Sequence, residues 1–186
     1  MPPQTISSII LAGGKARRMR GLDKGLQTYR GRRLIEHAIE SISPQVDEIL
    51  ISANRYLDEY ASLGYAVYPD KHDRFDGPLA GIASAIPHCK HDWILVIPCD
   101  MPFLPGDLVS KMKQYTNQAK LVAISNEGRL QLIFLLHRSL IDSIKLYLTG
   151  NQHTVMHWLD TVDHHVLAID NENHFYNINT FEQINS

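Results

Sequence analysis

Short apolar segments alternate with amphipathic segments along most of the chain. Strands are expected where apolar or β-branched residues are concentrated, at residues 6–11, 48–52, 65–68, 93–97, 121–125 and 130–136. Several of these segments are apolar at consecutive positions, which is typical of parallel strands covered by helices on both faces. Helical spacing of apolar residues predicts helices at residues 34–42, 79–86, 108–115, 139–148 and 154–160, and a last short helix from Thr180.

This alternation predicts an α/β fold of three layers, in which a mostly parallel, Rossmann-like sheet is flanked by helices. The chain has 186 residues, no repeat of fixed period and no long linker rich in Pro, Gly or Ser, so a single domain over residues 1–186 is expected. In such a sheet, ligands bind beyond the carboxyl ends of the strands. Candidate chemistry is therefore expected directly after each strand.

A net charge of -2 conceals one strongly basic segment. Eight of the 18 Lys and Arg residues, but one of the 20 acidic residues, fall between Lys15 and Arg33. A short positive segment in an otherwise acidic chain favours a small anionic ligand. Nucleic acid is not favoured as a partner, because proteins that bind it spread Lys and Arg over a whole face or helix.

Neither a membrane nor an oxidising compartment is indicated by the sequence. No apolar run exceeds five residues, whereas a bilayer span needs roughly 20. The first residues lack the basic and apolar regions of a secretory signal. Two cysteines, Cys89 and Cys99, are too few for a disulfide framework. A cytoplasmic protein is therefore expected.

A glycine-rich, basic segment follows the first expected strand. It is Leu11-Ala12-Gly13-Gly14-Lys15-Ala16-Arg17-Arg18-Met19-Arg20-Gly21-Leu22-Asp23-Lys24-Gly25-Leu26. Paired glycines at a strand end allow a sharp turn and bring backbone N–H groups close to phosphate oxygens, and Arg18 and Lys24 can neutralise the phosphates. The spacing matches neither the Walker A motif nor Gly-x-Gly-x-x-Gly. On these features alone, an ordinary solvated loop is an equal alternative.

Carboxylates follow two other expected strands. Asp100 lies directly after an apolar strand, in Pro98-Cys99-Asp100-Met101-Pro102, where a side chain faces the crevice rather than the core. Because Mg²⁺ takes few protein ligands and keeps several waters, one Asp together with triphosphate oxygens is enough to hold it. Asp70 has the equivalent place after residues 65–68. A loop-capping Asp100 and a turn-forming Asp70 are the simpler alternatives.

Taken together, the motifs resemble those of nucleotidyltransferases that activate small molecules with a nucleoside triphosphate, and in particular the molybdenum cofactor guanylyltransferases. The resemblance runs in order through nearly the whole chain. It rests on residues 11–26, Ala53-Asn54-Arg55, Asp70, Gly77-Pro78-Leu79-Ala80-Gly81, residues 98–102 and Asn177-Ile178-Asn179-Thr180. The sequence departs from the family pattern at Arg20, where glycine is common, at Ser52, where some relatives have Asn, and at Phe181, where proline is usual.

The resemblance implies transfer of GMP from GTP to the terminal phosphate of the molybdopterin cofactor, with release of pyrophosphate. It implies catalytic roles for Lys24, Asp100 and Arg18, with Asp100 as the Mg²⁺ ligand. The nucleotide site that it implies comprises Leu11, Ala12, Gly13, Gly14, Lys24, Asn54, Asp70, Gly81 and Asp100. The N-terminal part would bind GTP and Mg²⁺. The C-terminal part would bind the acceptor. The sequence leaves the exact acceptor contacts open, and the candidates in the second half of the chain are Arg129, Arg138, Asn177 and Asn179.

Two other functions stay open at the level of sequence. One is a related nucleotidyltransferase that uses CTP or another triphosphate on a different phosphorylated acceptor, since a glycine loop contacts phosphates and not the base. The other is a non-catalytic nucleotide-binding protein, although binding alone does not require a metal carboxylate. Beyond GTP and the molybdopterin cofactor, proteins of molybdoenzyme maturation are further expected partners, and neither nucleic acid nor a membrane is expected.

Other candidate chemistry is weaker. His153 and His157 are four residues apart, but Thr154 stands where a zinc protease motif needs Glu. Cys99 lies beside Asp100, yet no partnered His is evident, so it is expected to be a small buried thiol rather than a nucleophile.

Overall fold

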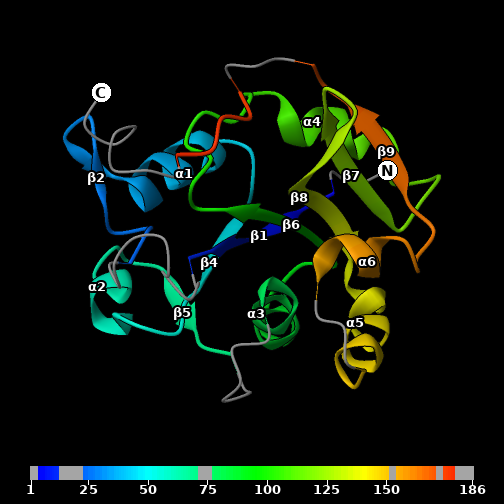
Figure 1. Ribbon diagram of the computed structural model, residues 1–186, viewed down its shortest axis with the longest axis horizontal. Helices are drawn as coiled ribbons and strands as arrows, with labels where there is room; N and C mark the ends of the chain where they lie inside the picture. The colour runs from blue at the N-terminus through cyan, green and yellow to red at the C-terminus, as the bar shows by residue number, and fades with distance from the viewer. Residues whose placement is uncertain (1–3, 13–22, 71–76, 151–153, 171–173, 179–186) are drawn as a thin grey trace.

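The centre of the molecule is a seven-stranded sheet (Figure 1). The computed structural model describes residues 4–12, 23–70, 77–150, 154–170 and 174–178. Across the sheet the strands are β5 (Ala66–Tyr68), β4 (Glu48–Ser52), β1 (Ile6–Leu11), β6 (Trp93–Pro98), β8 (Arg129–His137), β7 (Leu121–Asn126) and β9 (His165–Ala168). β8 pairs antiparallel with both of its neighbours, and the remaining pairings are parallel. The expected mostly parallel sheet is confirmed.

Helices cover both faces of this sheet, as its apolar strands require. They are α1 (Leu34–Ile42), α2 (Leu57–Ala61), α3 (Pro78–Ala85), α4 (Leu108–Lys113), α5 (Ile141–Leu148) and α6 (Val155–Leu159), with 3₁₀ turns η2 (Ile86–His88) and η3 (Arg138–Leu140). α1 and α4 lie on one face, and α3, α5 and α6 on the other (Figure 1). β1 contributes to both layers of the core: Ile6 and Ile10 pack with the first group of helices, and Ile9 and Leu11 with the second.

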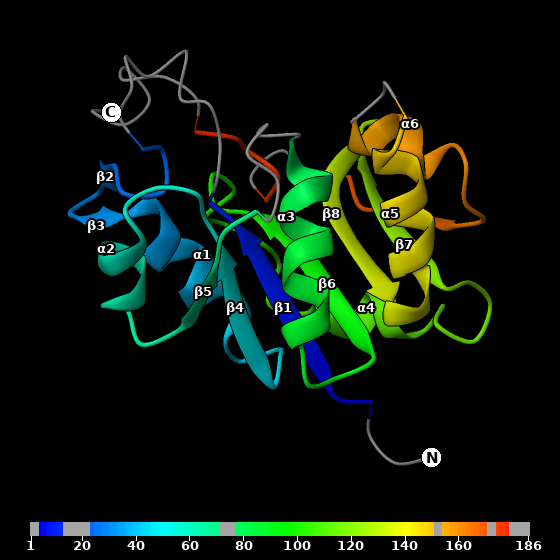
Figure 2. The same ribbon diagram turned by 90° about the horizontal axis from the view of Figure 1, so that it is seen from below.

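The register of four parallel strands brings their carboxyl ends together. Leu11 of β1 lies opposite both Ser52 of β4 and Pro98 of β6, and Ser52 lies opposite Tyr68 of β5. The segments that follow these strands therefore start side by side at one edge of the sheet (Figure 2). This edge, formed by the ends of β5, β4, β1 and β6, is called the carboxyl edge below, and the opposite edge is called the amino edge.

The strands and helices expected from the sequence are present, with ends displaced by at most two residues. The exception is the helix expected from Thr180, which lies outside the described residues. None of the helices in the described part of the chain has the length and apolar character that a membrane span requires.

Three short elements were not expected from the sequence. α2 has five residues and follows Tyr56, whose φ of 53° is in the left-handed region. A hairpin joins β2 (Thr28–Tyr29) and β3 (Arg32–Arg33) through Arg30 and Gly31, which both have positive φ, as a two-residue hairpin loop often requires. β9 has four residues that are only half-buried or exposed. Each element is too short for a hydrophobic period to be visible in the sequence.

Candidate active site

Expected site residues from four different segments lie at the carboxyl edge. Asn54, Asp70 and Asp100 each follow the last residue of their strand, β4, β5 and β6, by two positions. Because those strands are parallel and in register, the three side chains belong to neighbouring loops. Lys24 comes from the segment after β1, in a turn closed by a hydrogen bond from Gln27 N–H to its carbonyl oxygen at 3.1 Å.

Lys24 and Asp100 form an ion pair between the segments that follow β1 and β6. Lys24 Nζ lies 2.5 Å from Asp100 Oδ2, and the two side chains are 23% and 19% exposed. Their attraction is screened less than that of a surface pair, because most of each side chain is removed from water. The second oxygen, Asp100 Oδ1, is buried and has no hydrogen-bond partner among the described residues. A buried carboxylate oxygen without a partner is a suitable ligand for a divalent cation.

Asn54 and Asp70 are joined by two hydrogen bonds. Asn54 Nδ2 donates to Asp70 Oδ2 at 2.7 Å, and Asn54 Oδ1 accepts from the backbone N–H of Asp70 at 2.7 Å. Both side chains are thereby oriented, and the loops after β4 and β5 are connected. Asp70 is thus part of a link between two loops, whereas the simpler alternative was a turn within its own loop.

Gly81 allows α3 to approach this pair closely. A Cβ at Gly81 would occupy the space of Ser52 Oγ and would lie 3.1 Å from Asp70 Oδ1. α3 begins at Pro78, and the preceding Gly77 has a φ of 82°, a conformation that favours glycine. The helix expected at residues 79–86 is confirmed, with Pro78 as its first residue. Ser52, one of the three departures from the family pattern, is buried against Gly81.

Asp23 is a buried carboxylate beside Lys24, and the sequence patterns assigned it no role in the site. Its side chain is 4% exposed, and its Oδ1 accepts hydrogen bonds from the Tyr60 hydroxyl at 2.5 Å and from Gly25 N–H at 3.2 Å. Arg55 Nη2 is 4.0 Å from Oδ2. Burial raises the pKa of Asp23, although the hydrogen bond from Tyr60 and the charge of Arg55 act in the opposite direction. One signal was available: Asp23 is the single acid in the basic segment.

Cys99 is buried, as expected, and is 4% exposed. Burial raises the pKa of its thiol well above the ordinary value, and the neighbouring carboxylate of Asp100 raises it further. The thiolate that a nucleophile requires is therefore disfavoured. Among the described residues no group of three or more His, Cys, Asp and Glu side chains is arranged to hold a metal ion. His153 lies outside the described residues, so the discounted pair with His157 is not described.

Comparison with known proteins identifies the family. Residues 8–166 match the MobA-like NTP transferase domain. The chain belongs to the MobA-like NTP transferase family. It is 44% identical over 182 residues to a molybdenum cofactor guanylyltransferase of Shewanella sp. (strain MR-4), covering 96% of this chain and 92% of that protein. It is 42% identical over 184 residues to the protein of the same name from Shewanella woodyi, covering 96% and 93%.

Solved structures of low sequence identity share the fold of this MobA-like chain. The molybdopterin-guanine dinucleotide biosynthesis protein A of Archaeoglobus fulgidus superposes with a TM-score of 0.79 at 20% identity, over 96% of this chain and 95% of that one. The 4-diphosphocytidyl-2C-methyl-D-erythritol synthase of Anaerococcus prevotii superposes with a TM-score of 0.76 at 15% identity, over 97% and 95%. The three-layer fold expected for a nucleotidyltransferase is confirmed.

Part of the glycine-rich segment of this MobA-like domain lies outside the described residues, namely Gly13, Gly14, Arg18 and Arg20. Leu11 and Ala12 are described and are 8% and 5% exposed. Ala12 N–H donates to Ser52 O at 2.9 Å, and Leu11 O accepts from Cys99 N–H at 3.1 Å. The sheet thus continues just past β1.

The residues expected to bind an acceptor are divided between the two edges. Ile178 N–H donates to Asp100 O at 3.0 Å, so the backbone that follows Asn177 lies against the segment after β6. Arg129 is an exposed residue at the start of β8 and is paired with Asn126 at the end of β7. Asn179 lies outside the described residues.

Arg138, an expected acceptor contact, lies away from the Lys24–Asp100 pair. Its guanidinium donates to Cys89 O at 2.7 Å and lies 3.6 Å from Asp92, which directly precedes β6. Arg138 therefore lies at the amino edge, opposite Asp100. The physical reason is that β8 is antiparallel to β6, so the end of β8 falls at the start of its neighbour.

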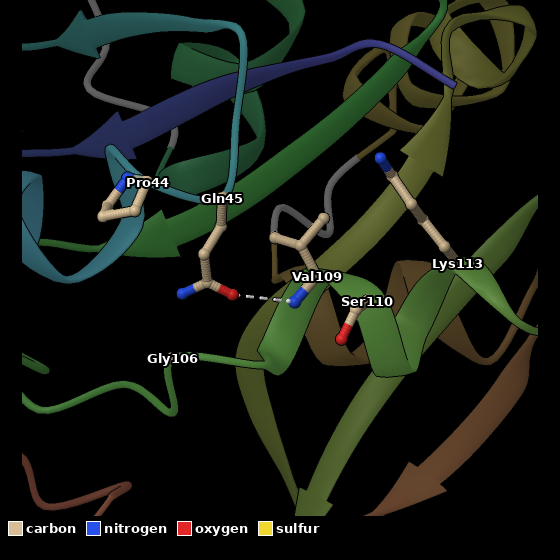
Figure 3. Close-up of a pocket in the computed structure, with 6 residues that line it drawn as sticks. All are labelled: Pro44, Gln45, Gly106, Val109, Ser110 and Lys113. Atoms are coloured by element: carbon tan, nitrogen blue, oxygen red, sulfur yellow. Dashed lines mark hydrogen bonds between the residues drawn. The ribbon is translucent and has the colours of Figure 1, made fainter. Parts of the chain in front are cut away.

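Two pockets differ in their distance from the segment that carries Asp100. One is lined by Pro44, Gln45, Gly106, Val109, Ser110 and Lys113, and Gln45 Oε1 accepts from Val109 N–H at 3.1 Å (Figure 3). Gln45 precedes β4, and Lys113 donates to Gln4 O before β1, so this pocket lies at the amino edge. The other is lined by His37, Glu40, Ser41, Pro102, Phe103, Leu104 and His174. It adjoins the segment that follows Asp100.

Proposed function

We propose that this chain transfers GMP from GTP to the terminal phosphate of the molybdopterin cofactor, forming molybdopterin guanine dinucleotide and pyrophosphate. The observation that carries the proposal is the Lys24–Asp100 pair at the carboxyl edge, in a chain whose relatives over nearly its whole length are named molybdenum cofactor guanylyltransferases. A cytoplasmic location, one domain with a C-terminal acceptor part, and contacts with molybdoenzyme maturation proteins belong to the same proposal.

Two groups of residues at the carboxyl edge would bind different parts of the nucleotide. Lys24 would contact the triphosphate, together with the backbone of residues 11–14 and the side chain of Arg18. Asn54 and Asp70 would face the ribose or the base, since their two mutual hydrogen bonds orient them beside α3. Gly81 would leave room for this part of the nucleotide.

Asp100 would hold the metal ion, for which Mg²⁺ is the expected species. Its buried Oδ1, without a partner among the described residues, fits a metal ligand, and carboxylate oxygen is the ligand type that Mg²⁺ prefers. When bound, the metal would draw charge from the phosphate oxygens. Lys24, paired with the same carboxylate, would then be close enough to hold the triphosphate beside it.

The reaction needs little covalent help from the protein. An oxygen of the acceptor phosphate attacks the α-phosphorus of GTP, and the bond from that phosphorus to the β-phosphate oxygen breaks, so pyrophosphate leaves with the electron pair. A phosphate nucleophile is already ionised near neutral pH and requires no general base. Positioning and charge neutralisation therefore supply most of the acceleration. Lys24 is suited to stabilise the charge that accumulates on the leaving pyrophosphate.

A panel of the four ribonucleoside triphosphates tests the proposal against the related transferases. Each is incubated with Mg²⁺ and the molybdopterin cofactor, and pyrophosphate release is measured. Release with GTP well above that with ATP, CTP or UTP is expected. Equal or greater release with CTP would contradict the assignment of GTP. GTP binding with no release from any of the four would favour a non-catalytic binding protein.

A further inference from the structure

We propose that Asp23, held by Tyr60, positions Lys24 for the triphosphate, a role that rests on the proposed function of Lys24. Asp23 precedes Lys24 in the chain, and its Oδ1 accepts from the N–H of Gly25, the residue that follows Lys24. This bond closes a short turn with Lys24 at its centre. A side-chain oxygen that bonds a backbone N–H two residues later fixes the backbone of the residue between them.

Other bonds hold the same turn together and tie it to α1. Gln27 Nε2 donates to Asp23 O at 3.0 Å, Gln27 N–H donates to Lys24 O at 3.1 Å, and Ile35 N–H donates to Gly25 O at 3.0 Å. The backbone on both sides of Lys24 is therefore held. The Asp23 carboxylate closes the turn, so its orientation determines the direction in which the Lys24 side chain leaves the backbone.

Tyr60 donates a second hydrogen bond to the same carboxylate oxygen. It belongs to α2, is fully buried, and places its hydroxyl 2.5 Å from Asp23 Oδ1. Gly25 is needed for this contact, since a Cβ at that position would collide with the Tyr60 hydroxyl. A buried hydroxyl and carboxylate are costly to remove from water, and Phe would fill the same space without that cost. Packing alone therefore gives no reason for the hydroxyl.

The same contacts connect the two halves of the proposed nucleotide site. Tyr60 and Arg55 follow β4, as does Asn54, and both face Asp23. The phosphate side, at Lys24, is thus linked through Asp23 to the loop that carries the nucleoside side. A displaced Asp23 would move Lys24 relative to both Asp100 and Asn54. Because a misplacement of about 1 Å can cost on the order of a hundredfold in rate, such a link matters for catalysis.

The test compares Tyr60→Phe, Lys24→Ala and the double variant for binding of GTP with Mg²⁺, by titration calorimetry. Tyr60→Phe should weaken binding about tenfold, as expected for loss of one hydrogen bond to a charged group. In the Lys24→Ala background it should cause no further loss, because Tyr60 acts through Lys24. In the pyrophosphate assay, KM for GTP should rise and KM for the acceptor should not, whereas a purely structural defect would lower kcat alone.

Tyr147→Phe is the matched control, since its hydroxyl is buried and has no hydrogen-bond partner in the described part of the chain. It should bind GTP like the unaltered protein. Gly25→Ala, which displaces the Tyr60 hydroxyl, should reproduce the effect of Tyr60→Phe. Two results would overturn the positioning role alone. One is normal GTP binding by Tyr60→Phe while Lys24→Ala binds GTP weakly. The other is a further loss of GTP affinity in the double variant as large as that caused by Tyr60→Phe alone. Normal binding by Lys24→Ala overturns both this role and the proposed one.

Discussion

Lys24 Nζ lies 2.5 Å from Asp100 Oδ2, so the cation that we assign to the phosphates is paired directly with the carboxylate that we assign to the metal. The two proposed ligands, metal and triphosphate, are therefore coupled. A metal ion at Asp100 competes with the ammonium group of Lys24 for the same carboxylate. A triphosphate reduces that competition, because its oxygens are alternative partners for Lys24.

Lys24→Ala should therefore have opposite effects on the two ligands. Binding of Mn²⁺, used as a spectroscopic substitute for Mg²⁺, should become tighter in the absence of nucleotide, since a positive charge beside the carboxylate is removed. Binding of GTP should weaken about tenfold or more, as an ion pair in a partly desolvated cleft is lost. Electron paramagnetic resonance of free Mn²⁺ measures the first effect, and calorimetry the second. Lys111→Ala, which breaks an exposed pair with Asp107, is the control. Weaker Mn²⁺ binding by Lys24→Ala would show that the lysine does not compete for the metal.

Asp100→Ala should lower the rate of GMP transfer by about a hundredfold or more, the scale seen when a group that stabilises transition-state charge is removed. The fold should be retained, because the side chain is at the carboxyl edge and not within the core. Pyrophosphate release and thermal unfolding are the two measurements. Asp107→Ala removes a carboxylate from an exposed Lys–Asp pair and should change neither. Full activity of Asp100→Ala would refute the metal assignment.

Gly81→Ala should weaken GTP binding, while the protein should keep most of its free energy of unfolding. Its Cβ would press on Ser52 and Asp70, and overpacking of this kind costs about 1 to 3 kcal/mol. Displacement of Asp70 should reduce GTP affinity about tenfold. Gly106→Ala is matched to it, since a Cβ there meets no atom within 4 Å among its neighbours, and it should bind GTP normally. Equal affinities for the two variants would contradict a nucleotide site beside Gly81.

Asp23→Asn should change how stability depends on pH. Burial raises the pKa of Asp23 in the folded state above its ordinary value of 3.8. At pH values between 3.8 and the raised pKa, the folded protein therefore binds more protons than the unfolded chain. As pH falls through this window, the unaltered protein should gain stability relative to Asp23→Asn, which has no ionisable group there. Urea unfolding at a series of pH values measures the difference. If the difference in unfolding free energy stays constant, or shifts in favour of Asp23→Asn at low pH, the pKa of Asp23 is not raised in the folded protein.

The long elements of the fold could be predicted because each has a clear hydrophobic period. The strand at β1 and the helix at α1 have the bounds expected from the sequence, since burial of β1 on both faces and of one face of α1 dictates their residues. α2 and β9 could not be predicted, because five and four residues are too few for a period to be visible. Yet α2 supplies Tyr60, so one missed element carries part of the site.

The site was predictable where a residue directly follows a parallel strand. Asn54, Asp70 and Asp100 are of this kind, and the strand register brings them to one edge. Asp23 and Tyr60 could not be paired from sequence, since they are 37 positions apart and their contact depends on the path of two loops. The position of Arg138 at the amino edge could not be predicted, because the direction of β8 cannot be deduced from the hydrophobic pattern of the strand.

Mass analysis of the product tests GMP transfer by this chain directly. The chain is incubated with GTP, Mg²⁺ and the molybdopterin cofactor, and the cofactor is then extracted and its mass determined beside that from Asp100→Ala. We predict a mass increase equal to one GMP residue with the unaltered chain, and none with Asp100→Ala. A cofactor of unchanged mass after incubation with the folded, GTP-binding chain would contradict the account.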